Sequence, residues 1–387
     1  MEPLINFLPN KNNNFNFRIL DCNVCLANAL RRTIISDIPT VVFKTDKELN
    51  NILYKFDINT SRYNNEFLKQ RLCCIPIHIK DFNTEIKDQL EFHIDLTNNT
   101  DTIQNVTTEH FKILDKNTNT FLDKSIVNKI LPPNEITGDY ILFAKLKPQI
   151  NDEIPGEKLK FWIRPTIGTS KENACYNVIS TCSYFQTPDE AKQLIEWEKI
   201  QDKLSSNPEI NIEKEKINWY NLEAKRITIP NSFDFTIESV GVYNPQFIVF
   251  KACEILINKI NECIRISKNN ELQVNESETT MDNCYDIIFQ DDFTPILGKL
   301  TTTLGKVFEY IGYELFYKEK NIISFICFKK IHPHDNHSIL RITFKKENIT
   351  DVETITKEFI LIKFIDICYK SIEIFDKIYK SFSFDTI

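Results

Sequence analysis

The sequence has no apolar run long enough to cross a membrane, because Lys, Asp or Asn interrupts each run well short of the roughly 20 residues that a transmembrane helix needs. The first residues, MEPLINFLPNKNNN, lack the basic start and apolar core of a signal peptide. With 387 residues, of which 42% are hydrophobic, the chain is long enough for two or three domains with their own cores. We expect a soluble globular protein.

The sequence also lacks a surplus of basic residues. It contains 47 Lys and Arg against 54 Asp and Glu, a net charge of −7. Basic residues occur in short pairs such as Lys329-Lys330, whereas proteins that bind phosphates by themselves carry a concentrated basic surface. We therefore expect no direct sequence-specific binding of nucleic acid.

Motifs of catalytic sites are missing as well. There is no Gly-x-Ser-x-Gly, and no Gly-Lys-Ser/Thr that would end a phosphate-binding loop. The eleven cysteines lie mostly in apolar patterns, as in proteins of a reducing compartment. We expect no catalytic residue and no cofactor. A cysteine-based enzyme, the alternative, would need an exposed thiol of low pKa beside a histidine.

Two groups could be considered as metal ligands. Cys22 and Cys25 form a C-x-x-C, but a tetrahedral zinc site needs a second pair, and the other cysteines offer no second C-x-x-C. His332, His334 and His337 lie close in sequence, and His332-Pro333 is more typical of a turn before a strand. We expect no metal at either group.

Residues 24–43 give the clearest structural signal. At about 100° per residue, one arc of a helix collects Val24, Ala27, Leu30, Ile34, Ile35 and Ile38. Pro39 ends this helix, and residues 40–43 have the composition of a strand. Arg31 falls inside the apolar arc and Arg32 lies beside it. Either the stem of Arg31 covers the core while its head reaches water, or the guanidinium is presented to another subunit.

These residues resemble a known family. Asn28-Ala29-Leu30-Arg31-Arg32, followed by Ser36, Ile38 and Pro39, is similar to the first helix of the assembly-platform subunits of cellular RNA polymerases: bacterial alpha, archaeal D and the third-largest nuclear subunit. Arg71 to Ile77 resembles a second family segment, with Gln70 in place of a histidine. Residues 168–176 resemble a third, with Ser170 and Asn173 replacing a glycine and a histidine.

The remaining pattern fits this order. We predict a flexible stretch at 1–14, then strands at 15–19, 75–79, 91–96, 140–144, 160–164 and 232–238, a short helix at 64–72, a helix capped by Thr187, and a long helix at 245–264. We expect residues 1–48 and 227–266 to form a first dimerisation half. Residues 49–226 would be an inserted β-rich domain with a helical extension, and residues 267–283 a linker.

Residues 284–387 repeat the plan of strand, helix, strands and long helix. Asp292 to Lys299 and His332-Pro333 resemble segments of the small partner subunit, archaeal L or the eleventh subunit of nuclear polymerase II. Gly298 and Gly305, seven residues apart, would allow close helix packing. The last helix has a heptad seam made of Leu361, Ile365, Cys368, Ile372, Phe375, Tyr379 and Phe382. Its expected partner is helix 245–264, through Leu256 and Ile260, so that one chain contains a pseudo-twofold dimer.

By this resemblance, the chain has the α+β fold of an RNA polymerase alpha N-terminal-like dimerisation domain and is a fused D- and L-type platform subunit without a catalytic site, as in large cytoplasmic DNA viruses. The implied partners are the second-largest and largest polymerase subunits and a small zinc-binding subunit, with no membrane and no homodimer. The candidate interface residues are Asn28, Arg31, Arg32, Glu66, Arg71 and Lys171. A viral origin implies the host cytoplasm, in the viral factory, with the virion as a second location. The alternative is a viral adaptor or clamp-like interaction protein outside transcription.

Overall fold

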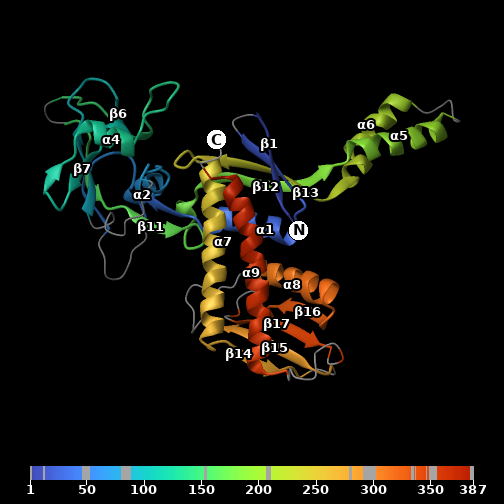
Figure 1. Ribbon diagram of the computed structural model, residues 1–387. Coiled ribbons are helices and arrows are strands. Elements are labelled where there is room, and N and C mark those ends of the chain that lie inside the picture. The colour runs from blue at the N-terminus through green and yellow to red at the C-terminus, as the bar shows by residue number, and fades with distance from the viewer. Residues whose placement is uncertain are drawn as a thin grey trace. The chain divides into compact units, whose positions relative to one another are not determined.

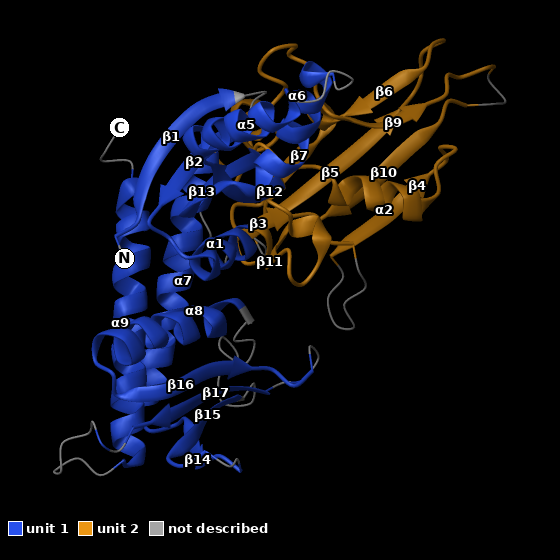
Figure 2. Ribbon diagram, turned by 90° about the vertical axis from the view of Figure 1, so that its right-hand side faces the viewer, with its two compact units in different colours: residues 1–34, 181–238, 245–387 blue, residues 35–180, 239–244 orange. Residues whose placement is uncertain are grey.

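The structure is a computed structural model, which describes residues 2–11, 14–45, 53–79, 89–151, 155–205, 211–278, 281–290, 302–332, 335, 337–345, 347 and 355–383. The chain divides into two compact units, shown in different colours in Figure 2. Unit 1 contains residues 1–34, 181–238 and 245–387, and unit 2 contains residues 35–180 and 239–244. None of the helices in these described ranges is long and apolar enough to span a membrane.

Unit 1 contains two halves with the same order of strands and helices. The first half consists of β1 (Leu4–Lys11), β2 (Asn14–Leu20), α1 (Val24–Ser36), β12 (Ile179–Pro188), β13 (Thr228–Ser239) and α7 (Pro245–Lys268). The second consists of β14 (Gln273–Glu276), β15 (Cys284–Gln290), α8 (Thr302–Gly312), β16 (Ile323–Lys329), β17 (His337–Phe344) and α9 (Lys357–Ser381), with a π-helical turn, η5 (Tyr313–Glu319), after α8. A few residues at the ends of α1, β12 and β13 belong to unit 2. The sheet orders are β1-β2-β13-β12 and β14-β15-β17-β16, so each strand has a counterpart at the same place in the other sheet.

The two sheets carry cross-strand ion pairs at corresponding strands, with the charges exchanged. In the first sheet, Arg18 on β2 donates to Asp234 on β13 through Nε and Nη2, at 2.6 and 2.9 Å. In the second, Arg341 on β17 donates to Asp286 on β15 in the same two-fold manner, at 2.7 and 2.8 Å. Such bidentate pairs are strong and directional, so each one favours a single register of its two central strands.

Helices α7 and α9 lie side by side and run antiparallel (Figure 1). Phe250, near the start of α7, stacks on Tyr379, near the end of α9, with ring centroids 4.2 Å apart. At the other end of the pair, Lys357 Nζ lies 3.4 Å from the carbonyl oxygen of Asn270, just beyond α7. The helix pairing expected from the heptad seam is therefore present.

Helix α9 is buried on more than the predicted seam. Of the seam, Leu361, Cys368, Phe375 and Phe382 are buried, while Ile365, Ile372 and Tyr379 are half-buried. A second buried row consists of Ile360, Phe364, Ile367, Ser371, Ile374 and Ile378. Among its contacts, the ring of Phe364 lies 5.3 Å from Phe308 of α8 and 5.6 Å from Phe289 of β15. The helix therefore packs both on α7 and on the second half.

The end of α9 reaches the first sheet. Phe382 lies just after the helix, and its ring centroid is 5.1 Å from that of Phe17 and 6.3 Å from that of Phe15, both on β2. At the start of the helix, Phe359 lies 5.5 Å from Phe344 of β17. One helix of the second half thus contributes to the cores beneath both sheets.

Unit 2 contains β3 (Pro39–Val42), β4 (Tyr54–Asn59), α2 (Asn65–Cys73), β5 (Leu90–Thr97), β6 (Gln104–Thr107), β7 (Lys112–Asp115), β8 (Thr120–Phe121), α4 (Lys124–Ile130), β9 (Leu142–Leu146), β10 (Lys158–Ile163) and β11 (Thr166–Thr169), with short 3-10 turns at η1 (Thr108–His110) and η2 (Ala174–Tyr176). Its strands form a sheet of order β4-β10-β5-β7-β8 and the pairs β6-β9 and β11-β3. One core joins the inner face of the large sheet, through Phe92 and Phe161, to Leu68 of α2 and Val127 of α4.

A pair of helices, α5 (Glu190–Leu204) and α6 (Ile212–Asn221), extends the first half between β12 and β13 and is followed by the 3-10 turn η3 (Glu223–Arg226). The buried Trp197 of α5 contacts Trp219 of α6 at a centroid distance of 5.7 Å. The predicted cap at Thr187 is wrong: Asp189 caps α5 by accepting a hydrogen bond from the Lys192 backbone, whereas Thr187 lies in β12 and donates to Asp234. The two helices belong to unit 1, although the sequence pattern grouped residues 186–226 with the insert.

Other local predictions differ from the structure where the pattern is short or polar. Residues 4–11, predicted as flexible, form β1 because they pair with β2. Part of the predicted linker forms β14, which pairs with β15. The predicted strand at 75–79 is not formed. In each case the pairing available in the folded chain, and not local propensity, decides the outcome.

Gly305 in α8 explains how this helix approaches the second sheet. A Cβ at Gly305 would lie 2.2 Å from ring carbons of Phe328 on β16, so any larger residue collides with that ring. Gly298, the other predicted packing glycine, and the rest of residues 291–301 lie outside the described residues.

We predict that Gly305→Ala destabilises the protein by about 1–3 kcal/mol in spite of the higher helix propensity of alanine, because the overpacking exceeds that gain. A lower melting temperature would measure this. Because Phe328→Leu removes ring atoms, it should cost less in the Gly305→Ala background than in the wild type. Purely additive effects of the two substitutions would contradict the packing explanation.

We further predict that Arg18→Asp and Asp234→Arg each lower stability, by about 1–3 kcal/mol, because each leaves a half-buried charge beside a like charge. The double variant, which reproduces the arrangement of Asp286 and Arg341, should recover most of the loss in a urea unfolding experiment. A double variant as unstable as the sum of the single variants would show that the two strands do not depend on this pair.

Candidate functional site

The exposed side of α1 carries the first group of candidate residues. Arg31 is half-buried and donates to Asn28 Oδ1 through Nε and Nη2, at 3.3 and 3.0 Å. Arg32 is exposed. Since Asn28 orients the guanidinium of Arg31, the three residues form one polar surface on the helix, in agreement with either interpretation of Arg31.

A hollow of about 170 Å³ lies beside this surface, between α1 and α8 of unit 1. It is lined by Val24, Cys25, Asn28, Arg32, Tyr184, Thr303 and Lys306. Helical periodicity placed Val24 in the core, but its side chain is 46% exposed and lines the hollow. Core packing of α1 begins only at Leu26. Both halves of unit 1 therefore contribute side chains to this surface.

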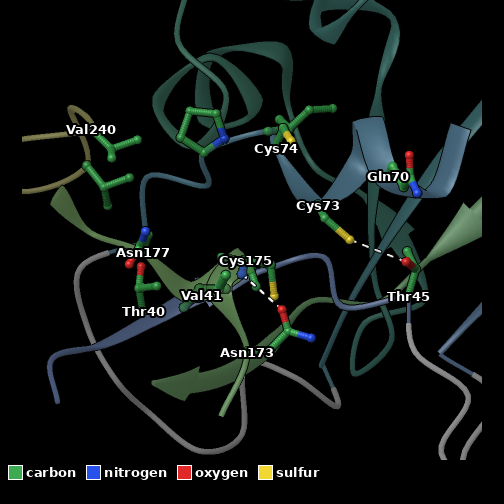
Figure 3. A pocket seen from close by; sticks show the side chains of 15 residues that line it. Thr40, Val41, Thr45, Gln70, Cys73, Cys74, Asn173, Cys175, Asn177 and Val240 are labelled. Carbon is green, nitrogen blue, oxygen red and sulfur yellow. Dashed lines mark hydrogen bonds between the residues drawn. The ribbon is translucent and has the colours of Figure 1, made fainter. Parts of the chain in front are cut away.

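A groove in unit 2 forms the second candidate site (Figure 3). One hollow of about 480 Å³ is lined by residues of β3, the end of α2 and the turn η2. A second, of about 370 Å³, is lined by Phe67, Arg71 and residues 141–143, among others. Gln70, Cys74 and Ile75 line both hollows, so that the two form one groove. The lining of both is mainly apolar, with the amides of Gln70, Asn173 and Asn177 among its polar groups.

Four segments that are far apart in the sequence meet at this groove. They are β3 with residue 45 after it, the end of α2 with residues 74–76, the loop that contains η2, and residues 240–242 before α7. The loop is fixed in several ways: the Lys171 backbone N–H donates to the Ser36 carbonyl at 3.1 Å, and Asn173 Oδ1 accepts from the Cys175 backbone. The second and third of these segments overlap the family-like stretches 71–77 and 168–176, and residues 40–42 directly follow the family-like residues 28–39.

Gly168 is required next to this loop. A Cβ there would lie 2.6 Å from the ring of Tyr176, which is buried and whose hydroxyl lies 2.8 Å from Thr166 Oγ1. Burial raises the pKa of the Tyr176 hydroxyl. The glycine therefore acts as a close-packing residue here, and not as part of a phosphate-binding loop.

Arg71 and Glu66 both lie on α2 but differ in their surroundings. Arg71 Nη2 donates to the Leu142 carbonyl at 2.6 Å, and its guanidinium lies over the Phe67 ring. Its buried Nε has no hydrogen-bond partner among the described residues. Glu66 is exposed and accepts from Lys69 Nζ at 3.3 Å. Arg71 thus shapes the wall of the groove, whereas Glu66 lies at the surface of the helix.

The residues predicted to join the two long helices differ in their burial. Leu256 and Ile260 of α7 are buried, as are Leu361 and Phe375 of α9, whereas Ile365 and Ile372 are half-buried.

The grouping and the burial of the cysteines bear on metal binding and on catalysis. Among the described residues, no three or more His, Cys, Asp or Glu side chains are grouped so that they could hold a metal ion, and His334 lies outside those residues. Burial raises the pKa of the Cys22 and Cys182 thiols to about 12. It also raises the pKa of Cys25, Cys253, Cys263 and Cys368. A reactive cysteine needs the opposite shift.

Two strand-and-helix halves around one helix pair, with surfaces left open on α1 and in unit 2, define an α+β dimerisation platform. The chain belongs to a known family of such domains. The family model of the RNA polymerase Rpb3/Rpb11 dimerisation domain matches residues 16–260, which confirms the predicted fold class and the resemblance at the level of the family.

Curated relatives agree with this family. The chain is 26% identical to DNA-directed RNA polymerases IV and V subunit 3B of Arabidopsis thaliana over 298 residues, which cover 65% of this chain and 87% of the relative. It is 23% identical to DNA-directed RNA polymerases I and III subunit RPAC1 of Homo sapiens over 292 residues, with coverages of 64% and 79%. The corresponding RPAC1 of Saccharomyces cerevisiae is 24% identical, with coverages of 63% and 81%.

We predict a graded reactivity of the thiols with a small disulfide reagent at pH 8. The exposed Cys74 should react within seconds to minutes, and Cys22 and Cys182 only on unfolding, because the neutral thiol is not the nucleophile. Mass spectrometry of quenched samples would assign each site. Rapid labelling of Cys22 in the folded protein would contradict the buried environment. It would favour the alternative hypotheses of a cysteine-based enzyme or of a metal site at Cys22 and Cys25.

Proposed function

We propose that this chain is a non-catalytic assembly subunit of a DNA-directed RNA polymerase, on which larger subunits dock. The observation that carries the proposal is the meeting of two family-like segments, together with the residues that directly follow the third, at one groove in unit 2. Residues that are close in space but distant in sequence, and that share a family resemblance, are more readily explained by a common partner than by local stability. The family match and the names of the relatives support a role in transcription.

We further propose that the chain unites a D-type and an L-type subunit. Residues beyond 260 lie outside the matched range, yet they form a second sheet with the same strand order and a second long helix. This repetition supports a dimer within one polypeptide, for which no homodimer is needed. The bias toward Lys, Asn, Ile and Phe fits an AT-rich genome, and we propose a large cytoplasmic DNA virus as the source and the host cytoplasm as the location.

For docking we propose two surfaces. The first consists of Asn28, Arg31 and Arg32 on α1, and the second of the groove with Glu66, Arg71 and Lys171 on its elements. The partners would be the second-largest and largest subunits and a small zinc-binding subunit. Arg71 would act mainly through the shape of the groove, because its guanidinium is bound to the Leu142 carbonyl.

The test is affinity purification of a tagged chain from its native source, with mass spectrometry and an assay of promoter-independent RNA synthesis. We expect two very large polymerase subunits in near-equimolar amounts. Arg32→Glu should lower their recovery about tenfold or more, because a reversed charge at an interface costs more than a lost contact. Ala174→Glu, at the exposed rim of the groove, tests the second surface in the same way.

Lys214→Glu on α6 is the matched control, since it reverses an exposed charge on a helix that contributes to neither surface. It should leave recovery unchanged, and all three variants should melt at the temperature of the wild type. Recovery of the chain alone, or with partners unrelated to transcription, would overturn the polymerase proposal and favour the adaptor or clamp-like alternative.

A further inference from the structure

The outer face of the five-stranded sheet in unit 2 carries basic and aromatic side chains that belong to neither proposed docking surface. Residues alternate along β5 and β10, so that Phe92, Ile94, Phe161 and Ile163 point into the core. The intervening residues therefore share the opposite face. On β10 these are Lys158, Lys160 and Trp162, followed by Arg164 just after the strand, at intervals of about 6.6 Å.

Neighbouring strands extend this face in two rows. In the first row, Lys55 of β4 lies opposite Trp162, Trp162 opposite His93 of β5, and His93 opposite Lys112 of β7. With strands about 4.8 Å apart, the row is about 14 Å long and has an exposed lysine at each end. The second row leads from Glu91 through Leu114 to Phe121 of β8.

Two aromatic rings on this face differ in their surroundings: Phe121 is exposed, and Trp162 is covered by a cation. Phe121 is 56% exposed and lies edge-on to the His93 ring, with a centroid distance of 5.8 Å. Trp162 is half-buried, and the guanidinium of Arg164 lies over its ring at 5.0 Å. An exposed phenylalanine among charged residues contributes little to folding, whereas aromatic and guanidinium planes are the groups on which unpaired bases stack.

The charges on this face favour an anion. Five basic side chains (Lys55, Lys112, Lys158, Lys160 and Arg164) oppose three acidic ones (Asp57, Glu91 and Asp95), a surplus of two positive charges in a chain of net charge −7. Each carboxylate is engaged by a cation: Asp57 by Lys55 at 2.9 Å, Asp95 by Lys160 at 2.8 Å, and Glu91 by Arg164 at 3.1 Å. The side chain of Glu91 is only 12% exposed. The side chain of Asp95 is 52% exposed but is engaged by Lys160, so that the face keeps its surplus of two positive charges.

We propose that this face binds a single-stranded nucleic acid without sequence specificity, with bases on Phe121 and Trp162 and phosphates along the lysines. Lysines lie at both ends of the first row and Arg164 lies over Trp162, so that cations flank the rings, as the binding of a chain of bases and phosphates requires. In the described part of unit 2, α2 and α4 pack on the inner side of this sheet, so that they are not placed to enter a duplex groove from the outer face, which favours unpaired bases. The proposal concerns unit 2 alone and stands whether or not the chain docks other subunits.

Fluorescence anisotropy with the full chain tests this, using labelled 12-mers of U and of dT and the corresponding duplex. We expect both single strands to bind more tightly than the duplex at low salt, and the comparison of U with dT to decide between RNA and DNA as the ligand. Phe121→Ser should weaken binding at least about fivefold with an unchanged salt dependence, because it removes only stacking. Lys112→Gln should lower the slope of log affinity against log salt by about 0.7, since it removes one phosphate contact.

Lys214→Gln on α6 is the control and should change neither quantity. Phe121→Ser should also still recover the large subunits in the purification described above, which separates this proposal from the docking function. The proposal is overturned if the full chain binds no single strand at low salt, if the duplex binds more tightly, or if Phe121→Ser and Lys112→Gln bind like the wild type. It is also overturned if poly-glutamate binds this face as tightly and with the same sensitivity to both variants, which would indicate an acidic protein segment.

Discussion

The antiparallel contact between α7 and α9 is the interaction on which the rest of unit 1 depends. Each helix buries a long apolar side, and full burial of one such side chain stabilises the fold by about 1.5–3 kcal/mol. Because Phe382 at the end of α9 enters the core under the first sheet, the first half does not close its core without the second. Separation of the halves would expose both helices, which explains why one chain that contains both can be a stable platform.

The two halves share a topology but not their side-chain chemistry. Both sheets have the same strand order, yet the arginine and the aspartate of the central ion pair occupy opposite strands in the two halves. The topology thus tolerates either arrangement as long as the pair is complete. Helices α1 and α8 occupy corresponding places in the two halves and border the same hollow, but they contribute different cations to it. These are Arg32 on α1 and Lys306, which is paired with Glu309, on α8.

In unit 2, the alternation of side chains across one sheet separates two roles. The inner face forms the core that positions α2, and the end of α2 in turn forms the floor of the groove. The outer face does not contribute to this core and carries aromatic rings and charged side chains. A change on the outer face is therefore separable from a change in the groove, which makes the two proposed binding functions independent in experiment.

The sequence by itself determined the helices α1, α7 and α9 and most central strands, because their apolar periodicity is local and long enough to outweigh competing patterns. It also determined the family, through residues such as Asn28, Arg31 and Arg32. Only the tertiary structure decided that β1 and β14 form, that Val24 is exposed, that Arg71 is bound to a backbone carbonyl, and that four distant segments meet at one groove. These features depend on partners far away along the chain, and no local window of sequence contains the information about which partners those are.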